Sequence, residues 1–581
     1  MHLPMRRYWV LLVNYLRPQR RRAALLAALL LTNIGLTLLS PQIMRFFIDT
    51  ALAGGAQNKL LQAALLFLGV AFAGQALTVI TSYLSEQVGW TATNQLRFDL
   101  VAHCLSLDLT FHNVHTPGEL LERIDGDVEK LANFFTQFTI NILSNGLLLL
   151  GVLFLLFIED WRIGGGLTFF ALVALLILAR LQTHAIPHWD KLRQLTAEFY
   201  GFLGEQLTST EDIRANGAQD YVLQRFYKFL RRWLPVQTQA NLAGYTMSMA
   251  SNALFAIGTL ITFGLGGTLG RSGAMSIGAI YLLVRYTDLL RIPILQIRSQ
   301  LIDLQQAEAN IDRVEKLLHT GSKLPKGGSE ILPTGPLAVN FQNVSFSYVG
   351  EETVLRNLTF QLAPGRVLGL LGRTGSGKST IARLLLRLYD PSRGELYVGN
   401  VPPSKANLQE LRRRVGLVTQ DVQLFQASVR NNLSFFNPTI SDAQMLAVLA
   451  DLELTSWLQS LPDGLDTELA AGGGGLSAGQ AQLLAFARIF LMDPGLVILD
   501  EASSRLDPAT EQLIERAVSK LLQNRTAILI AHRLDTVQRA DEILILDNGQ
   551  ILEQGLRLAL AADPTSHFHH LLQVGLAEVF A

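Results

Sequence analysis

The sequence predicts two folds in one chain: an N-terminal all-α domain with six membrane spans, and a C-terminal α/β domain. Composition indicates the first, because 49% of the 581 residues are apolar and only 17% are charged, against about 25% charged in ordinary soluble domains. The order of segments indicates the second. After residue 336, short β-branched strands alternate with helical stretches, which is typical of a largely parallel sheet.

The N-terminal half contains the apolar runs. A helix needs about 20 apolar residues to cross the hydrocarbon core of a lipid bilayer, and we expect six spans. They lie at Ala23–Met44, Leu60–Ser85, Leu131–Ile158, Ile163–Ala179, within Trp233–Gly270, and at Met275–Leu304. The arginines ahead of the first run place the N-terminus in the cytosol. A signal peptide is the alternative, but the run is too long and five more follow.

The segments between these runs differ in length and charge. Thr91–Lys130 and Arg180–Arg232 are long and charged, so we expect them to extend the flanking helices into the cytosol. The domain boundaries that we predict are 1–318 for the transmembrane domain, 319–336 for a linker rich in Gly and Pro, and 337–581 for the α/β domain.

Three charged residues interrupt the sixth run: Arg285, Asp288 and Arg291. Their spacing of three places them on one face of a helix. Charges within a span usually face a cavity, so one interpretation is a polar wall that contacts a transported molecule. The other is a structural ion pair close to the cytosolic side.

The stretch GRTGSGKST, from Gly372 to Thr380, has the spacing of a phosphate loop. It follows an apolar strand and precedes a helix, so its backbone N–H groups and the helix N-terminus can hold phosphates. Lys378 would reach the β- and γ-phosphates of a nucleotide, and Ser379 would ligate Mg²⁺. The residues of this predicted P-loop NTPase site are Gly372, Thr374, Gly375, Ser376, Gly377, Lys378, Ser379 and Thr380.

A second strand, LVILD, ends in two adjacent carboxylates. Asp500 at the strand end suits Mg²⁺ coordination, and Glu501 suits activation of the attacking water. Two solvated acids at a strand terminus are the alternative, but their position after a phosphate loop favours the catalytic interpretation.

With these motifs in this order, the chain resembles an ABC transporter half-subunit of the exporter type over nearly its whole length. Five further motifs match by position. Tyr348 in VSFSY matches the aromatic that stacks on adenine, and Gln420 matches the glutamine that contacts Mg²⁺. The signature loop LSAGQ supplies Ser477, Gly479 and Gln480, the D-loop SSRLD ends at Asp507, and His532 matches the switch histidine.

The resemblance implies an ATPase coupled to transmembrane transport, with ATP and Mg²⁺ as cofactors. Two nucleotide-binding domains would close on two ATP molecules, each held between the phosphate loop of one chain and the signature loop of the other. Regions near Pro117–Gly118 and Ile213–Gly217 would carry the coupling contacts. The implied cargo is a small hydrophobic or amphipathic molecule, and the implied location is a bacterial inner membrane with the nucleotide-binding domain in the cytosol.

Ala478 stands where the family signature LSGGQ has glycine, and its Cβ can crowd the γ-phosphate or restrict the backbone. Ala470, Ala471 and Arg505 also depart from the family pattern. These residues face the partner, so the pattern favours one chain of a heterodimer. A homodimer that tolerates LSAGQ stays open, as do an importer with the exporter fold and an ATP-binding regulatory subunit. Zero net charge and the lack of a basic stripe argue against nucleic acid as a partner.

Overall fold

The computed structural model describes residues 13, 15–137, 143–325, 327–348, 352–470, 472, 474–500, 508–531 and 537–574, without the side chains of 133–137, 297–309, 508, 509 and 574. The chain divides into two compact units. One comprises Met1–Leu105 and Pro117–Thr320, and the other comprises Ser106–Thr116 and Gly321–Ala581. The short segment Ser106–Thr116 therefore belongs with the C-terminal unit, which sequence alone did not indicate.

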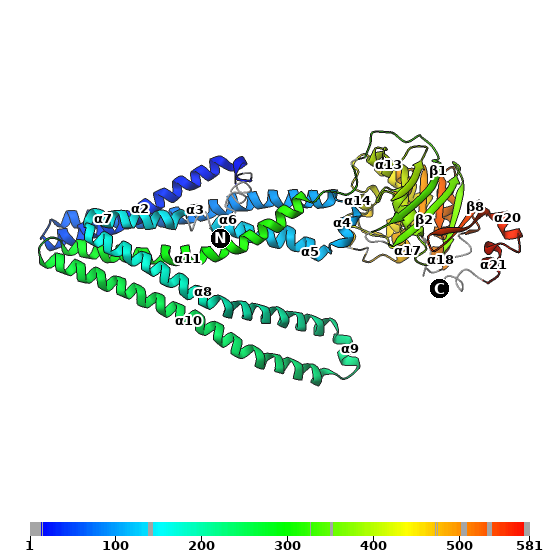
Figure 1. The fold of residues 1–581 in the computed structure, drawn as a ribbon. Helices are drawn as coiled ribbons and strands as arrows, with labels where there is room; N and C mark the ends of the chain where they lie inside the picture. The colour runs from blue at the N-terminus through cyan, green and yellow to red at the C-terminus, as the bar shows by residue number, and fades with distance from the viewer. Residues whose placement is uncertain are drawn as a thin grey trace. The chain divides into compact units, whose positions relative to one another are not determined.

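The N-terminal unit is helical. Its long helices are α2 (Arg20–Leu52), α3 (Gln57–Ser106), α8 (Trp161–Thr208), α10 (Gln219–Arg271) and α11 (Ile277–His319), and its shorter ones are α5 (Pro117–Leu121), η2 (Glu122–Gly126), α6 (Asp127–Gln137), α7 (Ser144–Glu159) and α9 (Thr210–Ala215). Figure 1 shows α8 and α10 running side by side, with α9 between their ends. They pack closely, since a Cβ at Gly258 would lie 2.7 Å from Cζ of Phe170. Small residues allow such approach between membrane helices.

The helical transmembrane domain is confirmed, but apolarity alone marks fewer spans than six. Within the described residues, four helices are long and apolar enough to cross a membrane: Arg17–Leu52, Gln57–Ser106, Trp161–Thr208 and Gln219–Arg271. The expected third span runs through α6 and α7, and residues 138–142 between them lie outside the described part. The expected sixth span is α11, a continuous helix of 43 residues whose charges lower its hydropathy.

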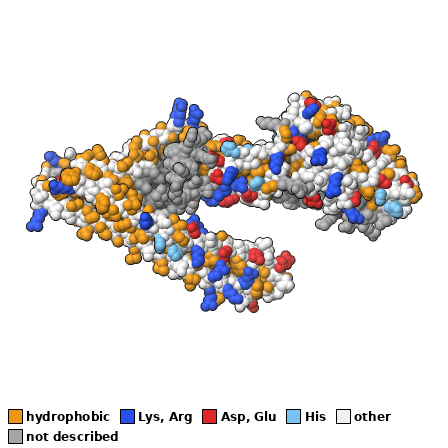
Figure 2. Space-filling model, viewed as in Figure 1, with side chains coloured by type: hydrophobic (Ala, Val, Ile, Leu, Met, Phe, Trp, Pro, Cys, Tyr) orange, Lys and Arg blue, Asp and Glu red, His pale blue; other side chains and the backbone are white. Residues whose placement is uncertain are grey.

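The surface of these helices is apolar. Figure 2 shows hydrophobic side chains gathered over the transmembrane helices, and Phe72 and Leu61 on α3 are 74% and 60% exposed. Exposed apolar surface of this extent is expected of helices that face lipid or another subunit.

The charged residues of α11 do not form one ion-paired group. Nη1 of Arg285 lies 3.5 Å from Oδ2 of Asp288, whereas Arg291 donates a hydrogen bond to Asn252 on α10 and lies over the ring of Phe255 at 5.7 Å. Arg285 lies eight residues after the start of α11, about 12 Å along the helix at 1.5 Å per residue.

The C-terminal unit contains two sheets. A three-stranded antiparallel sheet has the order β2 (Thr353–Leu362), β1 (Val339–Ser347), β4 (Arg393–Val398). A six-stranded sheet has the order β5 (Val415–Val418), β6 (Leu496–Asp500), β7 (Thr526–Ile530), β3 (Val367–Gly372), β8 (Glu542–Asp547), β9 (Gln550–Leu556). Its neighbours pair in parallel except for β8 and β9. The predicted largely parallel sheet is thus confirmed, and all six residues of β3 are buried.

Helices surround these sheets (Figure 1). They are α4 (Leu109–Val114), α12 (Lys378–Leu385), α13 (Leu408–Arg414), α14 (Val429–Ser434), α15 (Asp442–Asp451), α16 (Thr455–Ser460), α17 (Ala478–Met492), α18 (Pro508–Leu522), α20 (Arg557–Ala562) and α21 (His567–Val574). The segment that carries α4 ends just before Pro117, at the boundary between the two units, and the coupling role expected near Pro117–Gly118 stays a prediction.

Candidate active site

The phosphate loop connects β3 to α12, and two of its glycines are required by the backbone. Gly372 has φ 148°, and a Cβ there would lie 2.2 Å from the carbonyl oxygen of Leu546. Gly377 caps α12 with φ 106°, and its Cβ would lie 2.4 Å from Cδ2 of Leu355. Only glycine fits such positions without strain. The loop that the sequence predicted is therefore formed, and it ends at the N-terminus of a helix.

Polar side chains of the loop are buried around its backbone. Lys378 is only 6% exposed, and its Nζ donates hydrogen bonds to the carbonyl oxygens of Gly372 at 2.6 Å and Arg373 at 2.9 Å. Ser376 is 3% exposed, and its Oγ has no hydrogen-bond partner within the described residues. A buried hydroxyl without a partner is costly, so Ser376 is available to a ligand that enters the loop.

Two of the three residues expected to ligate the metal, Ser379 and Asp500, lie together. Oγ of Ser379 donates to Oδ2 of Asp500 at 3.2 Å, although 121 residues separate them in the chain. A hydroxyl and a carboxylate are hard oxygen ligands that fit Mg²⁺, which takes only one or two protein carboxylates and completes its shell with phosphate and water. Among the described residues, no group of three or more His, Cys, Asp or Glu side chains is arranged to hold a metal ion by itself.

The sheet order explains why these groups meet. β5, β6, β7 and β3 are parallel neighbours, so their carboxyl ends share one edge, where ligands bind in such sheets. Asp500 ends β6, Gly372 ends β3, and the exposed Gln420 follows β5 by two residues. Glu501, Asp507 and His532 lie outside the described residues, so their predicted roles stay predictions.

Tyr348 is held by the phosphate-loop helix. Its hydroxyl lies 2.9 Å from Oγ1 of Thr380, and Nη1 of Arg383 donates to it at 2.8 Å. The ring of Tyr389 meets the Tyr348 ring edge to face at 5.1 Å. Arg383 and Tyr389 did not emerge from the sequence. The spacing of three between Thr380 and Arg383, which places both on one face of α12, is the signal that could have found the arginine.

The signature loop forms a helix start with a capping box. Oγ of Ser477 accepts a hydrogen bond from N of Gln480, and Oε1 of Gln480 accepts one from N of Ser477. Ala478 is the first residue of α17 and is exposed. Its backbone is therefore helical, which alanine adopts readily. Of the two penalties expected of Ala478, backbone restriction does not arise, and only the methyl group remains.

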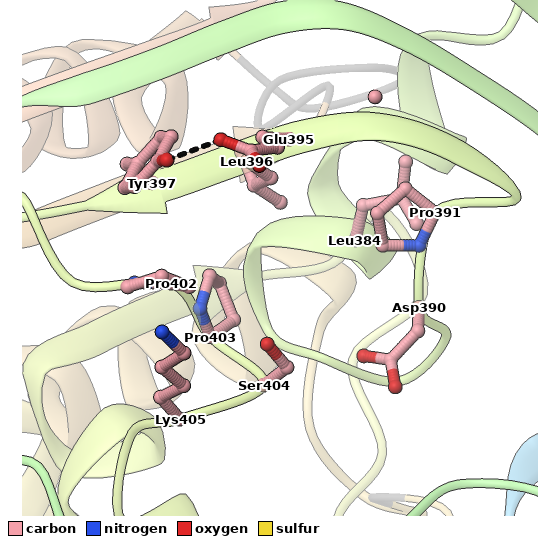
Figure 3. Close-up of a pocket in the computed structure, with 11 residues that line it drawn as sticks. Leu384, Asp390, Pro391, Glu395, Leu396, Tyr397, Pro402, Pro403, Ser404 and Lys405 are labelled. Atoms are coloured by element: carbon pink, nitrogen blue, oxygen red, sulfur yellow. Dashed lines mark hydrogen bonds between the residues drawn. The ribbon is translucent and has the colours of Figure 1, made fainter.

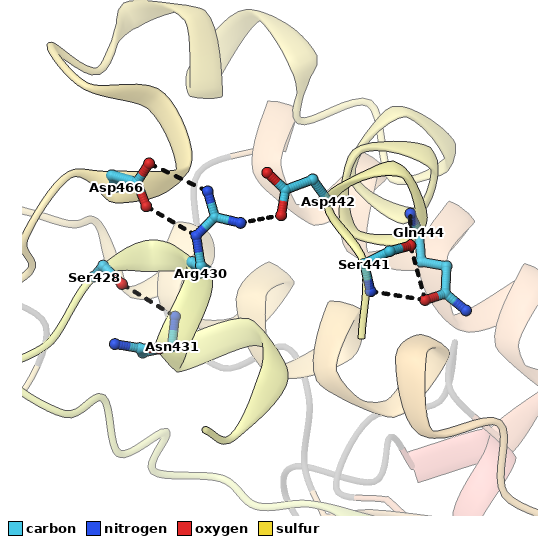
Figure 4. Close-up of polar contacts among 7 residues, drawn as sticks. All are labelled: Ser428, Arg430, Asn431, Ser441, Asp442, Gln444 and Asp466. Carbon is cyan, nitrogen blue, oxygen red and sulfur yellow. Dashed lines mark hydrogen bonds and ion pairs between the residues drawn. The ribbon is translucent and has the colours of Figure 1, made fainter. Parts of the chain in front are cut away.

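Two arginines form hydrogen bonds around α14 and α17 in this domain. Arg430 on α14 donates to Asp466 at 2.8 Å and also to Asp442, across the elements drawn in Figure 4. The hydrogen bonds raise the pKa of Arg430 and lower that of Asp466. Arg488 on α17 donates to the carbonyl oxygens of Asn432 at 2.6 Å and Gln423 at 3.0 Å. Its burial lowers the pKa of its guanidinium to about 10, so it stays charged at pH 7.

A separate cavity of about 210 Å³ lies beside β4 (Figure 3). Leu384, Asp390, Glu395 and Lys405 line it together with prolines 391, 402 and 403. None of the predicted nucleotide-site residues lines this cavity, so it is distinct from the phosphate loop.

Comparison with known proteins gives the same division of the chain. Residues 24–293 match the family model described as the ABC transporter transmembrane region, and residues 355–504 match the one described as ABC transporter. The ATP-dependent lipid A-core flippase of Idiomarina loihiensis is 30% identical over 583 residues, covering 97% of each chain. The ATP-dependent lipid A-core flippase 1 of Colwellia psychrerythraea is 29% identical over 575 residues, covering 95% of this chain and 93% of the other.

A solved structure of a bacterial Atm1-family ABC exporter with ATP bound matches with a TM-score of 0.76 at 26% identity, covering 96% of this chain and 97% of that one. The fold and the site thus define an ATPase domain of the phosphate-loop class joined to a helical transmembrane domain. The chain belongs to the ABC transporter family, as a half-transporter of the exporter type. It is an ATPase coupled to transport across a membrane.

Proposed function

We propose that this half-transporter pairs with a second one and exports a small hydrophobic or amphipathic molecule by ATP-dependent closure of the nucleotide-binding domains. The observation that carries the proposal is the pairing of Ser379 with Asp500 beside the buried phosphate loop, in a chain whose other half presents apolar helices. A site that binds ATP and a domain that spans lipid together favour transport over a soluble activity.

Each residue near the loop has a proposed role. Lys378 exchanges its hydrogen bonds to the carbonyl oxygens of Gly372 and Arg373 for contacts with the β- and γ-phosphates. The N–H groups at the start of α12 bind oxygens of the same phosphates. Ser379, Asp500 and Gln420 hold Mg²⁺, which neutralises charge on the phosphates when bound. Glu501 orients the attacking water, His532 contacts the γ-phosphate, and Tyr348 stacks on adenine.

The exposed signature loop supports a second subunit. Ser477 and Ala478 lie on the surface at the start of α17, where free N–H groups attract an anion. In this proposal they bind the γ-phosphate of ATP held by the partner. Ala478 and Ala470 favour a heterodimer, in which this chain contributes the weaker signature, and a homodimer is the alternative.

The charged residues of α11 (Arg285, Asp288 and Arg291) indicate what kind of molecule is transported. Arg285, Asp288 and Arg291 are exposed, and Arg291 has the neutral Asn252 as its hydrogen-bond partner. Each charge would cost about 2.5–3.5 kcal/mol in the hydrocarbon core, so these residues must face a cavity or another subunit. A polar cavity wall suits an amphipathic molecule. The relatives named as lipid A-core flippases support a lipid-like cargo, and a bacterial inner membrane as the location.

The test is steady-state ATPase activity of the chain purified alone in lipid nanodiscs, with Glu501→Gln as the control. We expect Glu501→Gln to lower turnover at least about 100-fold while ATP binding is retained, because the water loses its base. Robust turnover of the parent from a homodimer would rule out the need for a different partner. A Glu501→Gln variant as active as the parent would overturn the ATPase roles, as a regulatory subunit predicts.

A further inference from the structure

Helix α4 lies within the C-terminal unit, although the chain enters it from α3 and leaves it to α5. Asp108 caps this helix, since its Oδ1 accepts from N of Thr110 at 2.9 Å and from N of Phe111 at 3.2 Å. Its other carboxylate oxygen accepts from Oγ of Ser322 at 2.9 Å and from N of Lys323. Burial opposes the charge, but these hydrogen bonds outweigh it and lower the pKa of Asp108.

The other end of α4 is joined to Tyr389. Nδ2 of Asn113 donates to the hydroxyl of Tyr389 at 2.7 Å, across 276 residues of sequence. Leu109 packs against the same apolar cluster that contains Tyr389. Tyr389 is 6% exposed, so its hydroxyl faces a protein group rather than bulk water.

The ring of Tyr389 contacts the aromatic residue of the nucleotide site. It meets Tyr348 edge to face at 5.1 Å and an interplanar angle of 89°, and both rings touch Phe346, at 4.8 Å from Tyr348 and 5.4 Å from Tyr389. Tyr348 is in turn bonded to Thr380 of the phosphate loop. Asn113, Tyr389, Tyr348 and Thr380 therefore form one continuous set of contacts from α4 to the nucleotide site.

We propose that Tyr389 is a positioning residue that transmits occupancy of the adenine-stacking surface on Tyr348 to helix α4 through the hydrogen bond from Asn113. An adenine ring on Tyr348 fixes the orientation of that phenol. The edge of Tyr389 packs on it, so the Tyr389 hydroxyl is fixed as well. The base of ATP, and not only its phosphates, then orders α4.

The inference rests on the proposed role of Tyr348 but not on the cargo or on the second subunit. It goes beyond nucleotide binding because Tyr389 is not itself a predicted ligand of ATP or Mg²⁺ and meets the predicted site at the ring of Tyr348. The consequence is specific: a ligand with phosphates and no base should fill the loop without affecting α4.

The experiment is amide hydrogen exchange of the full chain in nanodiscs, without Mg²⁺ so that ATP is not hydrolysed. Exchange at residues 109–114 is compared without ligand, with ATP, and with inorganic triphosphate. For the parent chain we expect ATP to slow exchange at least about fivefold, the lower end of usual couplings between sites, and triphosphate to have no effect. Tyr389→Phe keeps the ring and removes the hydroxyl, so ATP should still bind but no longer protect α4.

Two further variants complete the design. Asn113→Ala breaks the same hydrogen bond from α4 and should match Tyr389→Phe, which keeps the test valid if one variant folds poorly. Tyr397→Phe removes a phenol that donates to Glu395 on the same strand, away from α4 and Tyr348 in the sequence of contacts above, and should behave as the parent. Undiminished protection of α4 by ATP in Tyr389→Phe, or equal protection of the parent by triphosphate, would overturn the inference alone. Failure of the parent to bind ATP would overturn the proposed function with it.

Discussion

The phosphate loop and the signature loop both lead into a helix, α12 and α17, yet the polar side chains at the start of α12 are largely buried and those at the start of α17 are more exposed. In the phosphate loop, Lys378 and Thr380 are 6% and 5% exposed, and Ser379 reaches Asp500 within the same domain. In the signature loop, Ser477 and Ala478 lie on the surface, and Ser477 forms its capping box with Gln480 of the same loop.

This difference shows which interactions determine the conformation of each loop. Packing against β2 and β8 shapes the phosphate loop, so its residues serve both folding and binding. The side chains of Ser477 and Gln480 in the signature loop form a helix cap on the surface, so folding and binding can be separated there by mutation. The following predictions use that separation, from the largest expected effect to the smallest.

Lys378→Ala should abolish the function of the phosphate loop. Removal of the ammonium leaves the developing phosphate charge without its buried cation, which should lower ATPase turnover at least about 100-fold and weaken the binding of a fluorescent ATP analogue. Lys405→Ala, at an exposed lysine outside the site, is the matched control and should stay at parental activity. More than a tenth of parental turnover in Lys378→Ala would contradict the assignment.

Ser477→Ala should separate folding from function. Loss of the cap should cost about 1 kcal/mol, whereas ATPase turnover of the dimer should fall about tenfold or more because a phosphate ligand is lost. Ser441→Ala is the matched control, since Ser441 forms the same capping box with Gln444 on α15. Thermal unfolding should show similar losses for both variants. Equal turnover in both would mean that Ser477 is only a cap.

Ala478→Gly should sharpen the comparison further, because the helical backbone at Ala478 tolerates either residue. Stability should fall by no more than about 1 kcal/mol. If the methyl group crowds the phosphate by a comparable amount, turnover of the chain alone should rise about fivefold. Steady-state ATPase assays check this. Unchanged turnover would identify LSAGQ as a working signature and would favour the homodimer.

Acid should weaken the ion pair between Arg430 and Asp466, and with it the stability of the fold, by a small amount. The pKa of Asp466 is lowered by the hydrogen bonds from Arg430, so the ion pair stabilises the fold above the unfolded pKa of about 3.9. That stability is lost as pH falls through the lower folded value. Asp466→Asn should therefore lower the melting temperature by less than about 2 °C at pH 6, and the gap should narrow as the pH falls below the unfolded pKa of about 3.9. A gap that widens on acidification would contradict the pairing.

Several features of the site follow from local sequence. The glycines of the phosphate loop, the strand before it and the helix after it are adjacent in the chain, and local steric rules fix their conformations. The same holds for Ser477 and Gln480, whose spacing of three suits a capping box. Apolar runs likewise predicted the transmembrane helices α2, α3, α8 and α10, since a run of about 20 apolar residues has one stable environment.

The sequence by itself determined these local elements and the chemistry that they offer. Only the tertiary structure decided which distant residues meet: Ser379 with Asp500, Asn113 with Tyr389, and the segment Ser106–Thr116 with the C-terminal unit. The physical reason is that local periodicity encodes which face of an element is buried. The partner of that face depends on strand order and helix packing, which are settled only when the whole chain folds.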